Sequence, residues 1–370
     1  MSRHERRIGQ AGMPPLDAGG PLLSRFEFWP AWLFYAPIWI WIACLMVRHR
    51  GIRLPLIANP RFPVGGLVGE QKSKLFALFS GAERARLPDY IVVRRRALSA
   101  DRQVTNIEAR FLACGIGYPL VAKPDIGCRG AGVRPIRSRN ALERYLQDFP
   151  VGEKIILQRM ADLAGEAGVF YVREPGQRAG QIISLTLKYF PHVVGDGRLT
   201  LRELILADPR AGKVSHLYLQ RFTHELDSVL AIGEARRLVF AGSHSQGAIF
   251  RNGNHYITEA MRRRFDAIAD GIEEFHFGRF DVRFDDFESL RRGDGFSIIE
   301  YNGAGAESTH IWDARTGLFE AWRALFVQFS LLFRIGAMNR RRGFRPESWT
   351  EFFGQWMREK RLKGRYPATE

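Results

Sequence analysis

A run of twenty uncharged residues near the N-terminus constrains the fold more than any other feature of the sequence. Residues 28–47 read FWPAWLFYAPIWIWIACLMV, and about 20 apolar residues are enough for a helix to cross a bilayer. The run also contains tryptophans, which prefer the membrane interface, and prolines, which interrupt helical hydrogen bonding. Two alternatives therefore stay open, a transmembrane helix and a broken hairpin that lies in one leaflet.

The compartment follows from the flanks of this run and from the cysteines. A cleaved signal peptide is disfavoured, because the run is long and aromatic and the RHRGIR that follows has no small-residue cleavage site. The chain has three cysteines, Cys44, Cys114 and Cys128, an odd number without the spacing of metal ligands. The sequence therefore indicates neither a disulfide framework nor a zinc site, and it fits a reducing compartment.

The charge balance points to an anionic partner. The 370 residues include 55 Lys plus Arg and 39 Asp plus Glu, a net charge of +16, which suits nucleotide phosphates, an anionic membrane surface or nucleic acid. Nucleic acid is disfavoured, because the basic residues are not interleaved with aromatics in a recognised module. Residues 334–370 hold ten Lys or Arg against four Glu and predict a solvated basic tail, with contact to lipid headgroups as the alternative.

From about residue 56 the sequence becomes globular, with short apolar strands and amphipathic helices. Strands are predicted at 90–93, 120–123, 155–158, 169–173, 182–187, 237–241, 280–284 and 297–301. A helix is predicted at 258–275, with Gly278 just past its end, and another after Trp312, packed on the core rather than on a membrane surface. Because strands outnumber helices in the middle of the chain, we expect an α+β fold with antiparallel sheets.

A lysine and a glycine-rich loop form the first chemical motif. Residues 118–133 read YPLVAKPDIGCRGAGV, in which Lys123 ends a predicted strand and Gly127, Gly130 and Gly132 follow. Glycines let backbone N–H groups approach phosphate oxygens, and the lysine adds positive charge. The motif lacks the ending of a P-loop, and a plain glycine-rich turn is the alternative.

Two carboxylates and an amide form the second motif. Asp281 lies on one predicted strand, whereas Glu300 and Asn302 are two residues apart on another and share a face. Such oxygen donors suit magnesium that keeps part of its water shell. Without a cation, the two buried carboxylates would need arginine partners, which Arg279 and Arg283 could provide.

Together these residues resemble the ATP-grasp family, in particular its D-alanine–D-alanine ligase and cyanophycin synthetase branch, over about residues 70–310. The resemblance implies two α+β subdomains with antiparallel sheets that grip ATP. It places Lys123 and the glycines of 127–132 over the phosphates and Arg279 near the transferring phosphoryl group. It implies these further positions: Gln158, Arg159 and Met160 at the adenine, Glu166 at the ribose, and Asp281, Glu300 and Asn302 as magnesium ligands.

A third segment extends the resemblance. Residues 188–210, KYFPHVVGDGRLTLRELILADPR, look like the GDG-x-x-T stretch of cyanophycin synthetase, which implies that Lys188 reaches the γ-phosphate. Read without the family, the two glycines mark a turn and Thr200 a helix cap. An earlier lysine of the family is matched by Lys74 or by Lys72.

The chain departs from the family after Asn302, where Gly-Ala-Gly-Ala-Glu-Ser-Thr-His replaces the expected segment beside the second substrate. Substrate identity therefore does not carry over. His244 and His310 fall near the expected cleft, but a structural role is favoured for both. Cys128 is interpreted as a small loop residue.

The resemblance implies an ATP- and Mg²⁺-dependent ligase that joins a carboxylate to an amine through an acyl phosphate. Because ATP is cytoplasmic, the catalytic domain is expected on the cytoplasmic face of the membrane. The alternatives are a membrane-tethered nucleotide-binding scaffold without ligase activity and a basic nucleic-acid-binding protein. Five segments are expected: a mobile arm (1–25), a membrane-associated segment (26–50), a shortened pre-ATP-grasp region (55–112), an ATP-grasp domain (113–310), and an amphipathic helix with a basic tail (311–370).

Overall fold

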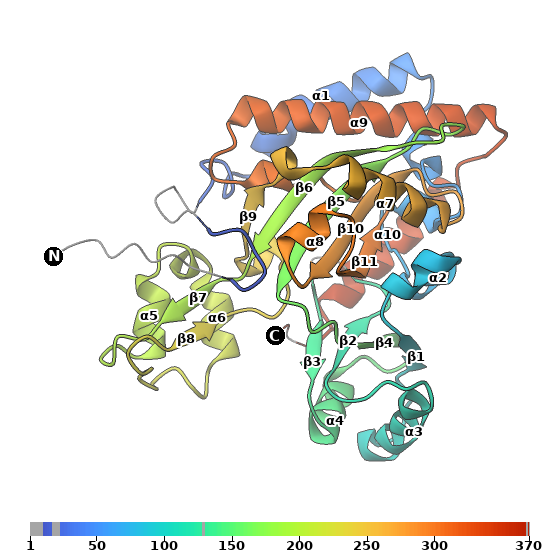
Figure 1. Ribbon diagram of the computed structural model, residues 1–370. Coiled ribbons are helices and arrows are strands. Elements are labelled where there is room, and N and C mark those ends of the chain that lie inside the picture. The colour runs from blue at the N-terminus through green and yellow to red at the C-terminus, as the bar shows by residue number, and fades with distance from the viewer. Residues whose placement is uncertain (1–9, 17–22, 128–129, 368, 370) are drawn as a thin grey trace.

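The computed structural model describes residues 10–16, 23–127, 130–367 and 369 of the chain. Its frame is a pair of antiparallel β-sheets with helices packed on them, and a small outlying module (Figure 1). The predicted α+β class with antiparallel sheets is confirmed. Parts of the expected arm at 1–25, and Cys128, lie outside the described residues.

The larger sheet has the strand order β11-β10-β5-β6-β9, and each neighbouring pair is antiparallel. Its strands are β5 (Gly165–Val172), β6 (Gln181–Tyr189), β9 (Ile249–Asn252), β10 (Phe277–Phe284) and β11 (Phe296–Asn302). Helices α7 (Glu259–Asp270) and α8 (Phe287–Arg291) pack on one face, where Phe265 and Ile268 join the main core. Helix α9 (Leu318–Arg341) covers the other face, where Leu332 packs with Phe170.

Two predicted boundaries need correction. The helix predicted at 258–275 begins beside its capping residue Thr258 but ends at Asp270, and Gly278 lies inside β10 instead of ending the helix. The predicted helix is too long because Ile272 and Phe275 continue the helical spacing of apolar residues. Both are buried, but they lie in the turn beyond α7. The expected strand at 237–241 is β8 (Ala235–Arg237), since the Arg237 side chain bonds the carbonyls that a longer strand would use.

The smaller sheet has the order β1-β4-β2-β3. Its strands are β1 (Tyr90–Arg94), β2 (Leu120–Pro124), β3 (Arg134–Ile136) and β4 (Lys154–Arg159). Helices α3 (Ala100–Ala113) and α4 (Arg139–Asp148) pack on it and form a separate hydrophobic core with its strands. The short helix α2 (Lys72–Ala77) comes before this sheet in the chain and adds Leu75 and Phe76 to the core of the larger sheet.

The outlying module follows β6 and has its own small core. It consists of β7 (His192–Val194), α5 (Leu201–Ala207), α6 (Ser215–Arg221) and β8, and lies to one side of both sheets (Figure 1). The predicted cap is confirmed: the Thr200 side chain accepts from the backbone of Glu203, whose carboxylate accepts from the Thr200 backbone. This capping box holds the start of α5.

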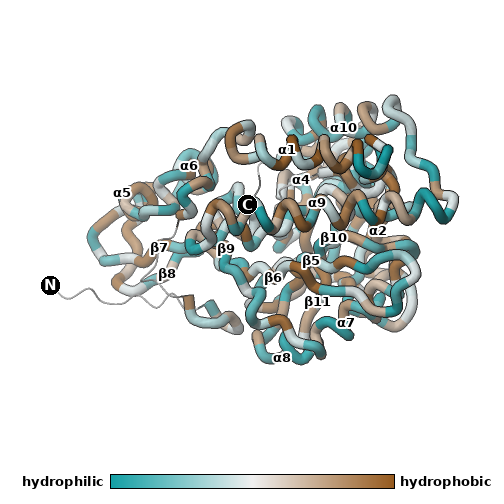
Figure 2. The backbone as a smooth tube through the Cα atoms, turned by 90° about the horizontal axis from the view of Figure 1, so that it is seen from above, coloured by the Kyte–Doolittle hydropathy of each residue, from teal (hydrophilic) through white to brown (hydrophobic). Residues whose placement is uncertain are grey.

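Helix α1 (Ala31–Arg48) runs alongside α9 (Figure 1). Of the two alternatives left open for this run, the structure does not match a broken hairpin: Pro30 occupies the N-cap, where it costs no hydrogen bond, and one helix continues through Pro37. Of the helices described, only α1 is long and apolar enough to cross a membrane. Helix α10 (Trp349–Lys363) occupies much of the predicted tail. It lies near α1 in the view from above (Figure 2) but well below α1 and α9 in Figure 1.

Candidate active site

A cleft of about 780 Å³ lies between the two sheets and gathers most of the predicted site residues. Those that line it are Lys123, Gly127, Gly130, Gln158, Arg159, Met160, Glu166, Lys188, Arg279, Asp281, Glu300 and Asn302. Gly132 does not line the cleft, because its backbone N–H donates to Thr369 Oγ1 near the C-terminus, at 3.1 Å. Segments more than 150 residues apart along the sequence are therefore brought together around one space.

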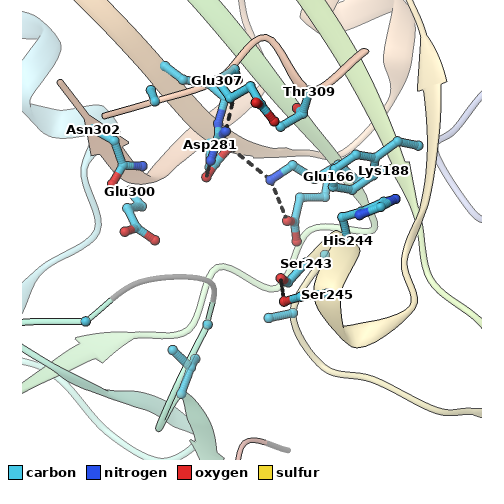
Figure 3. Close-up of a pocket in the computed structure, with 18 of the residues that line it drawn as sticks. Glu166, Lys188, Ser243, His244, Ser245, Asp281, Glu300, Asn302, Glu307 and Thr309 are labelled. Carbon is cyan, nitrogen blue, oxygen red and sulfur yellow. Dashed lines mark hydrogen bonds and ion pairs between the residues drawn. The ribbon is translucent and has the colours of Figure 1, made fainter. Parts of the chain in front are cut away.

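Lys188 is the centre of a buried ionic cluster on the larger sheet (Figure 3). Its Nζ lies 2.9 Å from Asp281 Oδ1 and 3.2 Å from Glu166 Oε1. Arg279 donates from Nε to Oδ1 of Asp281 at 3.0 Å and from Nη2 to Oδ2 at 3.1 Å. Burial alone would raise the pKa of Asp281, but Arg279 and Lys188 lower it to about 2. The Asp281 carboxyl group is therefore charged at neutral pH.

Lys123 reaches from the smaller sheet to the larger one. Its Nζ donates to Gln158 Oε1 at 2.7 Å and to the carbonyl of Ile299 at 2.9 Å. Burial lowers the pKa of this amine to about 8, so a neighbouring anion would hold it more firmly in the charged form. Gln158 thus has a second role beside its predicted place at the adenine, because it orients the lysine.

The structure distinguishes between the two early lysines. Neither lysine is among the residues that line the cleft. Lys72 is buried and its Nζ lies 3.2 Å from Glu300 Oε1 and 2.7 Å from the carbonyl of Gly127, both cleft residues, whereas Lys74 is exposed. Burial would lower the pKa of Lys72, but Glu300 and Glu70 raise it. This placement favours Lys72 for the role that the resemblance gives to an early lysine.

Sequence reasoning missed Glu70, which lies beside the predicted magnesium ligands. Its Oε1 accepts from the Gly303 backbone at 2.7 Å, and burial raises its pKa to about 8. With its amide oriented to satisfy both neighbours, Asn302 donates to Glu70 Oε2 at 3.0 Å and to Glu300 Oε1 at 3.2 Å. The only sequence signal was its position two residues before Lys72.

Only part of the predicted magnesium site is open to an ion. In the antiparallel register Asp281 pairs with Glu300, and Arg279 with Asn302. Among the described residues no group of three or more His, Cys, Asp and Glu is placed to hold a metal, and both Asp281 oxygens already accept from cations. Glu300 Oε2 and the Asn302 amide oxygen are the donors that these contacts leave for an ion, with water and phosphate oxygens completing its shell.

The other end of the cleft is aromatic, and no sequence motif indicates it. Glu307 lies there, five residues after Asn302, with Phe34 and Tyr35 of α1 and with Trp312. Its carboxylate accepts from Tyr35 Oη at 2.5 Å and from Trp312 Nε1 at 2.9 Å. Arg279 joins the two ends, because its Nη1 donates to the Glu307 carbonyl at 3.2 Å.

The two histidines differ in position. His310 is buried outside the cleft lining, with Nδ1 2.7 Å from Ser184 Oγ, and burial lowers its pKa to about 4. His244 lines the cleft and its Nε2 lies 2.9 Å from Oε1 of Glu27. These contacts fit a structural role for His310 and leave that of His244 as a prediction.

No protein-family model and no curated protein match the chain. Solved structures similar to it include a bifunctional glutathione synthetase from Pasteurella multocida (16% identity, TM-score 0.33, 69% of this chain). Others are D-alanine–D-alanine ligase from Bacillus anthracis complexed with ATP (13%, 0.37, 74% of this chain and 67% of that one) and D-cycloserine synthetase DcsG (14%, 0.37, 80% and 81%). The chain spans 36% of the length of the glutathione synthetase.

These neighbours are ATP-grasp ligases, the class that the sequence motifs resemble. At these identities and TM-scores the likeness carries no argument about residues, substrates or mechanism. The geometry of the cleft has to support any function on its own.

Proposed function

We propose that the protein is an ATP- and Mg²⁺-dependent ligase that joins a carboxylate to an amine. The observation that carries the proposal is the convergence of Lys123, Lys188 and Arg279 on one cleft with the carboxylates of Asp281 and Glu300. A structural ion-pair cluster needs no cavity, whereas this one lines about 780 Å³ of space between two sheets. Buried charges aimed at a cleft are typical of a site that binds and transfers charged groups.

The position of each residue in the cleft suggests which part of ATP it would contact. Lys123 and Lys188 approach from opposite sheets and would neutralise phosphate oxygens, each such contact contributing about 4 kcal/mol at an effective dielectric near 20. Arg279 would stabilise charge on the transferring phosphoryl group, since phosphoryl transfer depends mainly on positioning and electrostatics. Gln158, Arg159 and Met160 at the end of β4 would contact the adenine, and Glu166 the ribose.

Magnesium would be held by Glu300 and Asn302, with Asp281 beside them, and would supply charge compensation for the phosphates. The substrate carboxylate would attack the γ-phosphorus, forming an acyl phosphate as ADP leaves. The amine, in its neutral form, would then form its bond to the acyl carbon while the carbon–oxygen bond to phosphate breaks, and the departing phosphate would take up the proton that the nitrogen loses. This route requires no nucleophile from the protein, so neither Cys128 nor a histidine has to take part.

The test is a magnesium-dependent ADP-release assay of the purified full-length protein against pooled carboxylates and amines. We expect release that requires both pools and is lost, by a factor of at least about 10³, in Asp281→Asn and Glu300→Gln. Asp227→Asn is the matched control, because this exposed carboxylate pairs with Arg202 in the outlying module, away from the cleft. ATP binding without turnover under any condition would favour the scaffold alternative.

We also propose that α1 lies flat on the cytoplasmic membrane surface instead of crossing the bilayer. Its outward side chains are apolar and exposed, among them Trp32 (64%), Trp39 (54%) and Ile40 (68%). Its inward side packs on α9, where Trp41 Nε1 donates to Ser330 Oγ at 3.0 Å. A crossing α1 would take the exposed charges of α9, such as Arg323 and Arg334, into hydrocarbon, at about 3 kcal/mol each.

Site-directed labelling distinguishes the two placements. In inside-out vesicles from expressing cells, a membrane-impermeant maleimide should label Arg25→Cys and Arg50→Cys equally, because a flat helix keeps both of its ends on the cytoplasmic side. Labelling is measured above that of the parent protein. Protection of one position until detergent is added would mean that α1 crosses the membrane.

A further inference from the structure

Glu307 has no ion-pair partner among the described residues, in contrast to Glu27, Glu166, Asp281 and Glu300 of the same cleft. Glu70 and Glu359 share this property, but their carboxylates accept from backbone N–H groups, those of Gly303 and Gly69. Both groups that donate to Glu307, the Tyr35 hydroxyl and the Trp312 indole, are neutral. No Lys, Arg or His among the described residues lies within ion-pair distance of its carboxylate, and Arg279 reaches only its backbone carbonyl. A half-buried negative charge without a partner carries a desolvation cost that a cationic ligand would remove.

Glu27, at the same end of the cleft, is a carboxylate whose negative charge is compensated by neighbouring side chains. Arg210 donates to both of its oxygens, at 2.9 and 3.2 Å, and both side chains are almost fully buried. Burial would raise the pKa of Glu27, but His244 and Arg210 lower it. Glu27 is therefore part of the framework, whereas Glu307 faces the cleft with its charge available.

Aromatic rings surround this available charge. Trp312 packs against Phe34 with ring centroids 5.0 Å apart and against His244 at 5.3 Å, and Phe34 meets Tyr35 edge-on at 4.8 Å. A carboxylate among aromatic faces attracts an ammonium group through charge and through cation–π contact. An anionic or strongly polar group would gain nothing from these walls.

The position of Glu307 relates this end of the cleft to the proposed chemistry. Arg279 holds the Glu307 carbonyl with one nitrogen and Asp281 with two others, so the aromatic end begins one side chain away from the ionic cluster (Figure 3). The same cleft continues past Phe28 and Trp29, which are 55% and 40% exposed just before α1. A ligand whose amine contacts Glu307 therefore has apolar surface along which to extend.

We infer that the aromatic end binds the amine substrate, and that this substrate is a cationic amine on an apolar body, its ammonium group held by Glu307. The inference rests on the proposed function and specifies one of its two substrates. Glu307 acts as a specificity-determining residue, and the rings of Trp312 and Tyr35 contribute both the hydrogen bonds that orient it and the walls around the ligand.

Calorimetric binding of two probes tests this without knowledge of the acid. Phenethylamine and 2-phenylethanol have the same ring and chain but differ in charge. We expect the full-length protein, saturated with a non-hydrolysable ATP analogue and magnesium, to bind the amine at least tenfold more tightly than the alcohol. Glu307→Gln should abolish this preference, whereas the exposed Glu320→Gln on α9 should keep it.

Two results would overturn the inference: equal affinity for amine and alcohol in the wild type, or a preference for the amine that Glu307→Gln leaves unchanged. Binding of the ATP analogue is measured for every variant and serves as the test of folding. It also separates the two proposals, because a protein that binds no nucleotide fails the ligase proposal, whereas one that binds nucleotide but does not discriminate between the probes fails only the inference about the amine.

Discussion

The carboxylates of the ionic end and Glu307 at the aromatic end differ in how their charge is balanced. At the ionic end Asp281 accepts from Lys188 and Arg279, and Glu300 pairs with Lys72. At the aromatic end Glu307 accepts only from a hydroxyl and an indole. The comparison teaches that charge is preorganised where phosphates are proposed to react, and is left uncompensated where a cationic ligand is proposed to bind.

The largest effect is expected from removing the cation of the ionic end. In Lys188→Met, Glu166 and Asp281 lose a shared partner while both remain buried. Asp281 keeps Arg279 and Glu166 keeps Arg283, so we expect a cost of about 3 kcal/mol, that of a lost charge-assisted hydrogen bond. Urea unfolding followed by circular dichroism should show that decrease in the free energy of unfolding, together with loss of ADP release.

Lys213→Met is the matched control, because Lys213 is exposed in the outlying module, and its change should stay within about 0.5 kcal/mol. A Lys188→Met protein as stable as the control would mean that the cluster is hydrated and does not depend on this lysine.

A pH dependence of stability, of intermediate size, is expected from the buried His310. Burial lowers the pKa of His310 to about 4, with Asp313 opposing the shift, whereas an unfolded histidine titrates near pH 6.5. Between these values only the unfolded state takes up the proton, so stability is complete above about pH 6.5 and falls as the pH is lowered.

From pH 7 to pH 5 this one group should cost about 2 kcal/mol of unfolding free energy. Other groups titrate over the same range, so the informative quantity is the difference in slope between the wild type and His310→Gln, measured by urea unfolding at each pH. Parallel slopes would show that His310 does not stay neutral in the folded state.

The smallest effect should come from the hydrogen bonds of Glu307. Trp312→Phe keeps a ring in the cleft wall but removes the indole donor, at about 1 kcal/mol of stability. Affinity for phenethylamine should fall less than in Glu307→Gln, because the charge remains. Trp322→Phe is the control, since that indole donates to the Phe34 carbonyl at 2.9 Å; an equal loss of amine affinity in both variants would contradict a specific role for Trp312.

The ionic end could be predicted largely from the sequence. Asp281, Glu300 and Asn302 lie on neighbouring antiparallel strands, and period-two alternation is enough to place their side chains on a common face. Lys123 ends a predicted strand that the structure shows as β2, whereas Lys188 is assigned through the family resemblance and lies on β6, just beyond the strand predicted at 182–187. Local spacing thus places Glu300 and Asn302 on one face, but the pairing of Asp281 with Glu300 is a tertiary contact.

The aromatic end could not be predicted in this way, because its residues come together only through the packing of α1 on α9. Tyr35 and Glu307 are 272 residues apart in the sequence, and the residues between them show no pattern that pairs them. The apolar run predicts a membrane-associated segment. Nothing in its pattern indicates that one side of it also forms a wall of the cleft. Glu70 was missed for the same reason, since its importance lies in contacts with Gly303 and Asn302 from across the chain.

The most direct test of the central claim follows the oxygen atoms of the acid. The carboxylate that supports the greatest ADP release is labelled with ¹⁸O in both oxygens and incubated with ATP, magnesium and the amine, and the released phosphate is examined by mass spectrometry. Transfer through an acyl phosphate predicts one ¹⁸O atom in each phosphate formed together with product. Phosphate without ¹⁸O, released at the same rate as product, would contradict the account.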